Sequence, residues 1–140
     1  QELTSFTYHL VNKNELIAEI TDVVTKLEQK LHDNPEIKKE LKQITKLTEQ
    51  NNDVDVDWQN FIKSFDQVHT NFFKRLNEEF KDLSPNDYKL CTYLRMNLAT
   101  KEIASLMNIS IRSVETNRYR LRKKLGLDSE TNLSQFLMNY

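Results

Sequence analysis

The stretch SIRSVETNRYRLRKKLG, residues 110–126, decides how the rest of the chain is interpreted. Val114, Leu121 and Leu125 recur at helical spacing and fall within about 40° of one another on a helical wheel, which predicts one buried seam. The opposite side carries long donors and one aromatic ring, namely Arg112, Thr116, Tyr119 and Lys123, with Arg120 beside them. Six basic residues stand against one acid, a local excess of +5. Taken alone, a solvated basic face explains this helix best.

The composition indicates an all-α chain. Among 140 residues there are one glycine and two prolines, far below the usual ~7% and ~5%, so few residues can break the chain into strands. The single cysteine, Cys91, cannot form an internal disulfide, which favours a reducing compartment. There is no apolar run of transmembrane length and no signal peptide. Because the chain begins with Gln1, we expect a cytoplasmic fragment of a longer protein, with any tether to the inner membrane in a region outside it.

The formal charge of −1 conceals two unlike halves. Residues 1–83 contain 11 Lys or Arg and 16 Asp or Glu, a net charge of −5. Residues 84–140 contain 9 Lys or Arg and 5 Asp or Glu, a net charge of +4. The carboxyl-terminal half is therefore suited to a polyanionic partner and the amino-terminal half is not.

A heptad pattern runs through residues 3–31. The repeating apolar residues are Leu3, Leu10, Ile17, Val24 and Leu31, with Phe6, Ile20 and Leu27 three places after three of them. Only Lys13 breaks the second series. Such a seam is typical of coiled coils and helical hairpins, so residues 1–82 are predicted to be a helical dimerisation and signalling segment. The partner helix can come from this chain or from a second copy, and a lone helix on a membrane fits less well because its polar face mixes Glu and Lys.

Three further features follow the heptads. Asn34 and Pro35 predict a cap and first turn for a second helix, with its apolar stripe at Ile37, Leu41 and Ile44. Residues 49–57 are polar and are predicted to be a loop with a helix cap; they lack the glycine and the closing glutamate of a calcium loop. From Trp58 to Phe80, aromatic and aliphatic residues at helical spacing predict one helix buried on more than one neighbour.

No residues with enzymatic chemistry emerge from the sequence. There is no phosphate-binding loop, no pair of catalytic carboxylates and no nucleophile beside a base, so we do not expect an enzyme. His9, His32 and His69 are scattered and do not make a metal site with Cys91. His9 could accept a phosphoryl group as in sensor kinases, whereas His32 is expected to meet carbonyls at a helix end and His69 to pack in the core. No cofactor, metal or small-molecule ligand is predicted.

Helix signals become dense from Leu83 to Tyr140. Ser84, Pro85 and Asp87 predict a helix start, and Leu90, Cys91 and Leu94 its buried stripe. Asn97 is expected to turn the chain in the left-handed conformation, and a short helix follows over residues 100–107 with Ile103, Ala104 and Leu106 inward. Asn108 and Ile109 predict a tight turn, Ser110 the next cap, and Gly126 the end of the helix. Ser129 is expected to cap a last helix with Leu133, Phe136 and Leu137.

A short helix, a tight turn and a longer basic helix are typical of proteins whose second helix enters the DNA major groove. Residues 83–136 resemble the LuxR/GerE-type helix-turn-helix of bacterial transcription regulators. The resemblance rests on LeuSerPro at 83–85 with Asp87, LysGluIleAla at 101–104, Ser110, ArgSerValGlu at 112–115 and LysLeuGly at 124–126. The preceding helical stretch also resembles the cytoplasmic end of bacterial membrane-bound sensor regulators.

The resemblance implies a DNA-binding surface. Glu115, Thr116 and Tyr119 match the positions from which the recognition helix reaches base edges; Glu115 could accept from cytosine N4 or hold a neighbouring arginine. Arg112 and Ser113 match its amino-terminal end, and Thr100 and Lys101 match the place where the first helix meets phosphate. Arg120 and Lys123, which the helical wheel places outward, complete the predicted surface. Late in the helix, Arg122, Lys123 and Lys124 could contact phosphate or be solvated as readily as read a base.

Four residues depart from the family pattern. Ala99 replaces the usual hydroxyl cap before the first helix of the motif, which is expected to abolish the capping box with Glu102, at a cost of about 1 kcal/mol unless Thr100 caps instead. Asn97 replaces a glycine. Asn117 and Glu130 stand where the family often has a histidine and a basic residue.

The sequence thus predicts long coiled-coil-like helices over residues 1–82, followed by a four-helix helix-turn-helix DNA-binding domain over residues 83–140. We expect a transcription regulator in signal transduction that binds double-stranded DNA as a homodimer, with a recognition helix over residues 111–125 and RNA polymerase as a possible further partner. Two alternatives remain open at this point: a promoter-binding domain like sigma-factor region four, and a helical phosphorelay or scaffolding module without DNA binding.

Overall fold

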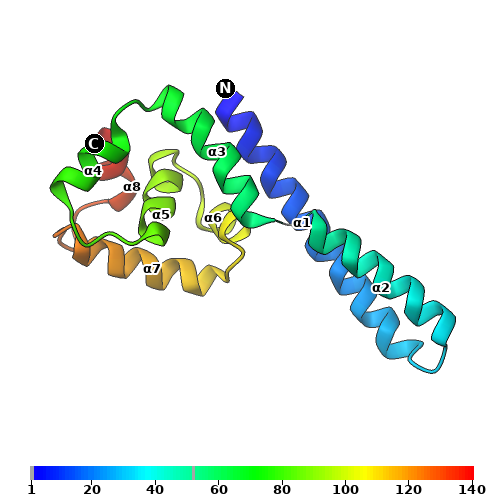
Figure 1. Ribbon diagram of the computed structural model, residues 1–140. Coiled ribbons are helices and arrows are strands. Elements are labelled where there is room, and N and C mark those ends of the chain that lie inside the picture. Colours follow the sequence, from blue (N-terminus) through cyan, green and yellow to red (C-terminus); the bar gives the residue numbers. More distant parts are fainter. Residues whose placement is uncertain (1, 52) are drawn as a thin grey trace. The chain divides into compact units, whose positions relative to one another are not determined.

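The computed structural model describes the backbone of residues 2–51 and 53–140, and the side chains of these residues other than 2–4 and 54. These residues form eight α-helices and no strand, which confirms the all-α prediction (Figure 1). The chain divides into two compact units, Gln1–Ile62 and Lys63–Tyr140. The expected functional limits of 1–82 and 83–140 stay a prediction, and residues 63–82 pack with the carboxyl-terminal unit.

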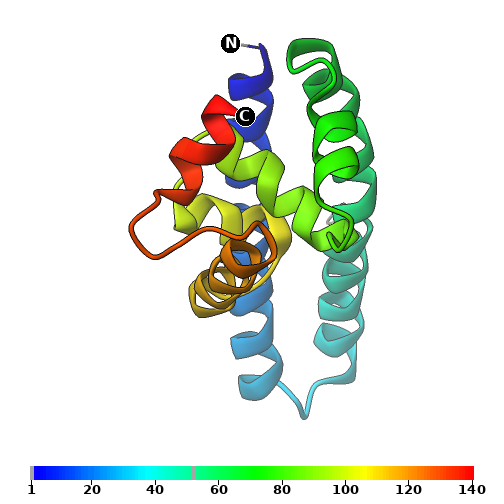
Figure 2. The ribbon, with the colours of Figure 1, turned by 90° about the vertical axis from the view of Figure 1, so that its left-hand side faces the viewer.

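The amino-terminal unit is built on an antiparallel hairpin of α1 (Glu2–Lys30) and α2 (Pro35–Gln50), which lie side by side in Figure 2. The side chain of Asn34 accepts hydrogen bonds from the backbone N–H groups of Glu36 and Ile37 at 3.2 and 3.3 Å, and Pro35 occupies the first turn. This confirms the predicted cap. The heptad helix therefore finds a partner within its own chain.

The heptad positions are buried unequally. Ile17 and Val24 are buried, whereas Leu27 is 37% exposed and the side chain of Leu3 lies outside the described residues. Nearer the amino terminus the buried residues are Thr7 and Val11, which the heptads do not include. The partner changes along α1, because its first half meets α3 (Val54–Val68): the Phe6 and Phe61 rings are 6.2 Å apart, and Lys13 pairs with Asp57 at 2.7 Å. Because α1 contacts α3 in its first half and α2 in its second, a single heptad pattern does not describe the buried face along the whole helix.

Two predicted boundaries were wrong. The loop expected at 49–57 is shorter, because α2 continues to Gln50 and α3 begins at Val54, where the Asp53 carboxylate accepts from the N–H groups of Asp55 and Val56, both at 3.1 Å. The helix expected to run from Trp58 to Phe80 is broken between Val68 and Phe72. Asn71 adopts a left-handed conformation with φ of 69°, which ends one helix and starts α4 (Phe72–Glu79).

The core of the carboxyl-terminal unit surrounds α5 (Pro85–Arg95), which packs against α7 (Ile111–Lys124) and α8 (Leu133–Asn139). In Figure 1 α5 lies beside α8 and above α7. Its fully enclosed side chains come from every helix of the unit: Phe65, Phe72, Leu76, Leu90, Leu94, Ile103, Val114, Leu121, Leu133 and Leu137. Cys91 is also buried, as predicted, and burial raises the pKa of its thiol to about 12.

Arg95 joins three parts of this core. Its guanidinium lies 4.6 Å from the centre of the Phe72 ring, and it donates hydrogen bonds to Nδ1 of His69 at 3.0 Å and to the carbonyl of Leu137 at 2.8 Å. His69 stacks on Phe65 with ring centres 4.4 Å apart. Burial, and next the charge of Arg95, lower the pKa of His69. The predicted packing role of His69 is confirmed, and the ring also accepts a hydrogen bond.

Most of the predicted helix ends in this unit are confirmed. Ser84 and Asp87 form a reciprocal capping box, in which Asp87 Oδ2 accepts from the Ser84 N–H at 2.8 Å and Ser84 Oγ from the Asp87 N–H at 3.2 Å. Asn97 has φ of 59° and follows the last turn of α5, as expected. The last cap was predicted wrongly: Asn132, not Ser129, caps α8 by accepting from the Gln135 N–H at 2.9 Å.

None of the helices in the described part of the chain combines the length and apolar character needed to cross a lipid bilayer.

Candidate nucleic-acid interface

The predicted helix-turn-helix is present in the carboxyl-terminal unit. Helix α6 (Thr100–Met107) ends at Asn108, whose φ of 55° is left-handed, and the N–H of Ile109 donates to the Ala104 carbonyl at 3.0 Å. Two residues later Ser110 starts α7, and its Oγ accepts from the Ser113 N–H at 3.0 Å. The turn between the two helices is therefore fixed by backbone conformation and a side-chain cap.

The start of α6 corrects one expectation. Ala99 occupies the N-cap position and has no side-chain acceptor, but Glu102 Oε1 still accepts from the Ala99 N–H at 2.9 Å. Half of the capping box therefore persists without the hydroxyl group. The backbone donor that the missing hydroxyl would have satisfied is at the amino end of α6, where an anion is favoured.

Helix α7 has one fully buried face, as the sequence predicted. Val114 and Leu121 are completely enclosed and Leu125 is 6% exposed, whereas Tyr119 is 58% exposed. The remaining side chains on the outward face are exposed as well: Arg112, Ser113, Glu115, Thr116, Arg120 and Lys123. The hydrophobic contacts of the seam hold the helix against the core, so its outward face is presented on a rigid support.

The basic residues of α7 divide into two groups. Arg118, Arg122 and Lys124 are directed to the protein itself. Arg118 donates to Thr100 Oγ1 at 3.4 Å, and Arg122 donates to the carbonyls of Asp128, at 2.9 Å, and Thr131. The other three, Arg112, Arg120 and Lys123, make no ion pair within the residues described. The local excess of positive charge is therefore concentrated on the outward face.

Lys124 pairs with Asp87 across the unit, with 2.5 Å between Nζ and Oδ2. Partial burial by itself would raise the pKa of Asp87. The hydrogen bond from Lys124 and those from Ser84 outweigh burial, so the pKa of Asp87 is lowered. This pair ties the end of α7 to the start of α5, and it removes Lys124 from the set of cations available to a ligand.

Gly126 ends α7 in the predicted way. Its φ is 70°, its N–H donates to the Lys123 carbonyl at 3.1 Å, and the next N–H, from Leu127, donates to the Arg122 carbonyl at 3.0 Å. This pair of bonds is a Schellman motif, which needs a left-handed residue. The chain then turns back, which allows Arg122 to reach the loop that follows.

The structure brings most of the predicted site residues together. Arg112, Thr116, Tyr119 and Lys123 lie along one face of α7, where Lys123 Nζ is 4.6 Å from the centre of the Tyr119 ring and Thr116 Oγ1 donates to the Arg112 carbonyl at 3.1 Å. Thr100 and the exposed Lys101 begin α6, and Arg118 connects that end to α7. Sequence reasoning missed Arg118, because its helical position indicates a side but not which neighbouring helix it reaches.

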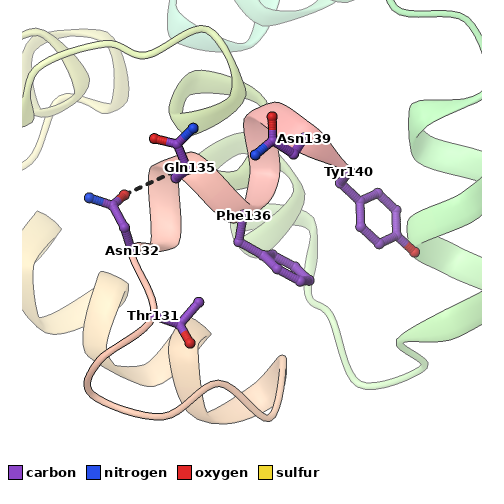
Figure 3. Close-up of a pocket in the computed structure, with 6 residues that line it drawn as sticks. All are labelled: Thr131, Asn132, Gln135, Phe136, Asn139 and Tyr140. Atoms are coloured by element: carbon purple, nitrogen blue, oxygen red, sulfur yellow. Dashed lines mark hydrogen bonds between the residues drawn. The ribbon is translucent and has the colours of Figure 1, made fainter.

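A surface pocket lies along α8 (Figure 3). Its lining is Thr131, Asn132, Gln135, Phe136, Asn139 and Tyr140. Asn132 is occupied in capping α8, and the Tyr140 hydroxyl donates to the Arg75 carbonyl at 3.1 Å and contacts the Glu79 carboxylate. Burial, and next the hydrogen bond to Glu79, raise the pKa of Tyr140 to about 12. The pocket has no charged group in its lining, and no cluster of metal-ligating side chains occurs among the described residues.

The comparison with protein families agrees with this geometry. Residues 81–137 match the family model described as bacterial regulatory proteins, luxR family. The match covers α5 to α8 except for the last residues of α8, and it supports a DNA-binding transcription regulator. Neither the search of curated proteins nor the search of solved structures gave a match.

Proposed function

We propose that this chain is a sequence-specific DNA-binding transcription regulator that acts in the cytoplasm as a homodimer, with α7 as its recognition helix. The observation that carries the proposal is the division of α7. Its seam, Val114 and Leu121, is fully buried, while Arg112, Thr116 and Tyr119 are exposed on the other side. A helix held in this way presents donors to a groove at little cost in ordering.

The outward face combines groups for two kinds of contact. Thr116 and Tyr119 lie midway along α7, where side chains of a docked helix reach base edges. Arg112, Arg120 and Lys123 surround them and are suited to phosphate, which fixes register without reading sequence. Glu115 adds an acceptor for cytosine N4 or a partner for a neighbouring arginine. The face is therefore suited to contact base edges at its centre, which reads sequence, and phosphates around it, which does not.

The start of α6 supplies a second phosphate contact in this proposal. The exposed Lys101 stands in the first turn, next to Thr100, and the N–H groups of a helix amino terminus favour an anion. Arg118 bonds to Thr100 and so couples the position of α6 to α7. With two copies, the two recognition helices would read half-sites about 10 to 10.5 base pairs apart, centre to centre.

The test is duplex selection from a random DNA library, followed by anisotropy titrations of the selected duplex and a scrambled one at several salt concentrations. We expect salt-sensitive binding that prefers the selected duplex. For Tyr119→Ala, the penalty for a wrong base pair, ordinarily ~1–3 kcal/mol, should fall at the positions under Tyr119, with less change for Tyr119→Phe. Equal affinity for both duplexes in the unchanged, dimeric chain would contradict sequence-specific function.

For Lys101→Ala we expect a uniform loss of affinity on both duplexes and a salt slope that is shallower by about 1, because one phosphate contact is removed. The matched control is Lys74→Ala, which removes the same charge from the exposed surface of α4, outside the motif. An unchanged salt slope for Lys101→Ala would remove α6 from the proposed interface.

A further inference from the structure

One side of the α1–α2 hairpin carries apolar side chains that remain exposed. Leu16, Val23 and Leu27 of α1 are 37–56% exposed, and Ile44 and Leu47 of α2 are 39% and 53% exposed. Single exposed apolar residues are ordinary, but a contiguous group on a monomer marks an interaction surface.

The helical wheel places all five on the same side of the hairpin. On α1, Leu16, Val23 and Leu27 lie within about 40° of one another, and their centre is about 90° from the buried Ile17 and Val24. On α2, Ile44 and Leu47 are displaced in the same rotational sense, by about 60° and 120°, from the buried Leu41. In a pair of antiparallel helices, two sets of residues that are displaced in the same rotational sense from the buried residues lie on the same side of the pair. The exposed residues of α1 and α2 therefore share one side of the hairpin. We call these five residues the hairpin face.

Charged residues border the hairpin face near the turn. Lys26 and Lys30 stand on α1, and Glu36 and Glu40 stand on α2, with the same spacing of four residues. Measured from the turn, each lysine lies within about 2 Å along the axis of one glutamate, since one residue rises about 1.5 Å. Lys26 also pairs with Asp22 of its own helix at 3.0 Å, and exposed pairs of this kind contribute little.

We infer that the hairpin face is covered by the same face of a second copy, with the two-fold axis parallel to the hairpin. The inference rests on the proposed homodimer and specifies how it forms. In this arrangement α1 of each copy lies over α2 of the other at equal distance from the turn, in a four-helix bundle. Val23 then meets Ile44, and Leu16 meets Leu47, so apolar residues cover apolar residues on both sides of the axis.

Charge complementarity selects this arrangement. With α1 over the partner's α2, Lys26 and Lys30 of one copy stand opposite Glu40 and Glu36 of the other, and symmetry repeats both contacts. A two-fold axis perpendicular to the hairpin would instead set α2 against α2. Glu36 and Glu40 would then face α2 of the partner copy, which has no lysine on the hairpin face. The parallel bundle also sends both chains onward from the same end.

Charge reversal in the 140-residue chain tests the inference. One variant carries Lys26→Glu with Lys30→Glu, and the other carries Glu36→Lys with Glu40→Lys. Sedimentation equilibrium should show each variant alone associating at least tenfold more weakly than the unchanged chain. An equimolar mixture should regain a dimer that contains one copy of each, because both rims are again complementary.

The matched control is Lys38→Glu with Lys42→Glu, an equal change of charge on the side of α2 roughly opposite the hairpin face, where both lysines are exposed. It should leave the dimer intact. Circular dichroism at each step establishes that the helices are retained. The inference is overturned if the Glu36→Lys, Glu40→Lys variant alone dimerises like the unchanged chain, as a perpendicular axis requires, or if the unchanged, helical chain stays monomeric at high micromolar concentration.

Val23→Ser with Ile44→Ser gives an independent measurement, because both side chains are exposed and contribute little to the fold of one copy. The loss of association should match or exceed that of the charge variants. DNA binding separates this inference from the proposed function. A dimer that responds to the charge variants as expected but binds no duplex would contradict the function alone. Sequence-specific binding by a chain whose association ignores these variants would contradict the inference alone.

Discussion

In the carboxyl-terminal unit Leu94, Ile103 and Leu121 are fully enclosed, whereas in the amino-terminal hairpin Leu16 and Leu47 keep more than half of their area exposed. Both units are helical and both show apolar periodicity in the sequence. The difference is that α5 packs against both α7 and α8, while the second half of α1 packs against α2 alone in the hairpin. Periodicity thus identifies an apolar face, and the number of neighbours decides how much of that face one copy can bury.

The contrast extends to the helix ends. The carboxyl-terminal unit has a capping box at Ser84, left-handed residues at Asn97 and Asn108, and a Schellman motif at Gly126. At the turn of the hairpin, Asn34 caps α2, and Nδ1 of His32 lies 3.2 Å from the Gln29 carbonyl at the end of α1. Local hydrogen bonds and backbone conformation thus fix both ends of α5 and of α7 in the carboxyl-terminal unit.

The largest expected effect on the free energy of unfolding comes from comparing two leucine-to-alanine substitutions, one in each unit. Leu121→Ala removes a fully enclosed side chain and should lower the free energy of unfolding of the carboxyl-terminal unit by ~2–5 kcal/mol. Leu16→Ala, at 56% exposure, should change that of a monomeric chain by less than ~0.5 kcal/mol. Its effect should grow with protein concentration, because the residue lies in the proposed dimer surface.

Each unit has its own probe for this measurement. Trp58, the single tryptophan, reports the amino-terminal unit by fluorescence, and the buried thiol of Cys91 reports opening of the carboxyl-terminal unit by its rate of modification. Leu121→Ala should accelerate modification of Cys91, and Leu16→Ala should not. Equal rates of Cys91 modification in the two variants at low protein concentration would contradict the difference in burial between the units.

The sequence anticipated what depends on neighbours within a helical turn. The seam of Val114, Leu121 and Leu125, the cap at Ser110 and the stop at Gly126 all follow from local spacing and backbone conformation, and the structure has them. The exposed face of α7 follows from the same spacing. The assignment of its residues to base or phosphate stays a prediction.

What the sequence did not predict depends on distant partners. From the sequence, Arg122 and Lys124 could contact phosphate or solvent, and Arg118 had no assigned role. Only the fold shows that Arg118 reaches Thr100, Arg122 the loop carbonyls and Lys124 the Asp87 carboxylate. The break at Asn71 had no local signal stronger than the apolar periodicity around it. Thr7 is buried because α1 changes partner along its length, which a heptad count cannot detect.

The second prediction concerns Gly126, where φ is 70° and a Cβ atom would meet nothing within 4 Å. Gly126→Ala should therefore cost only the strain of a left-handed residue, ~1–2 kcal/mol, less a fraction recovered from the unfolded chain. Gly126→Asn is the matched control, because the same unit places Asn97 and Asn108 in that conformation. Urea unfolding should show a smaller loss for asparagine than for alanine. Equal losses would indicate a steric cause, in conflict with the open space.

The smallest expected effect on stability is the difference between two ion pairs, one in each unit. The Asp87 side chain is 13% exposed and bonds Lys124 and Ser84, whereas Asp22, paired with Lys26 on α1, is 65% exposed. Because the pKa of Asp87 is lowered in the folded state, its contribution is present above the ordinary value of 3.8 and is lost as the pH falls through the lowered pKa. Lys124 remains 37% exposed, so screening limits the contribution to about 1 kcal/mol.

Asp87→Asn should therefore lower the free energy of unfolding at pH 6 and reduce its decline between pH 4 and pH 2, because the native state no longer favours an ionised group at this position. Near-ultraviolet circular dichroism is a suitable signal, since four of the five tyrosines lie in the carboxyl-terminal unit. Asp22→Asn, the control from the hairpin, should leave both quantities unchanged within error. A decline with acid that is as steep in Asp87→Asn as in the unchanged chain would assign the acid sensitivity to other carboxylates. The link between the start of α5 and the end of α7 would then rest on packing alone.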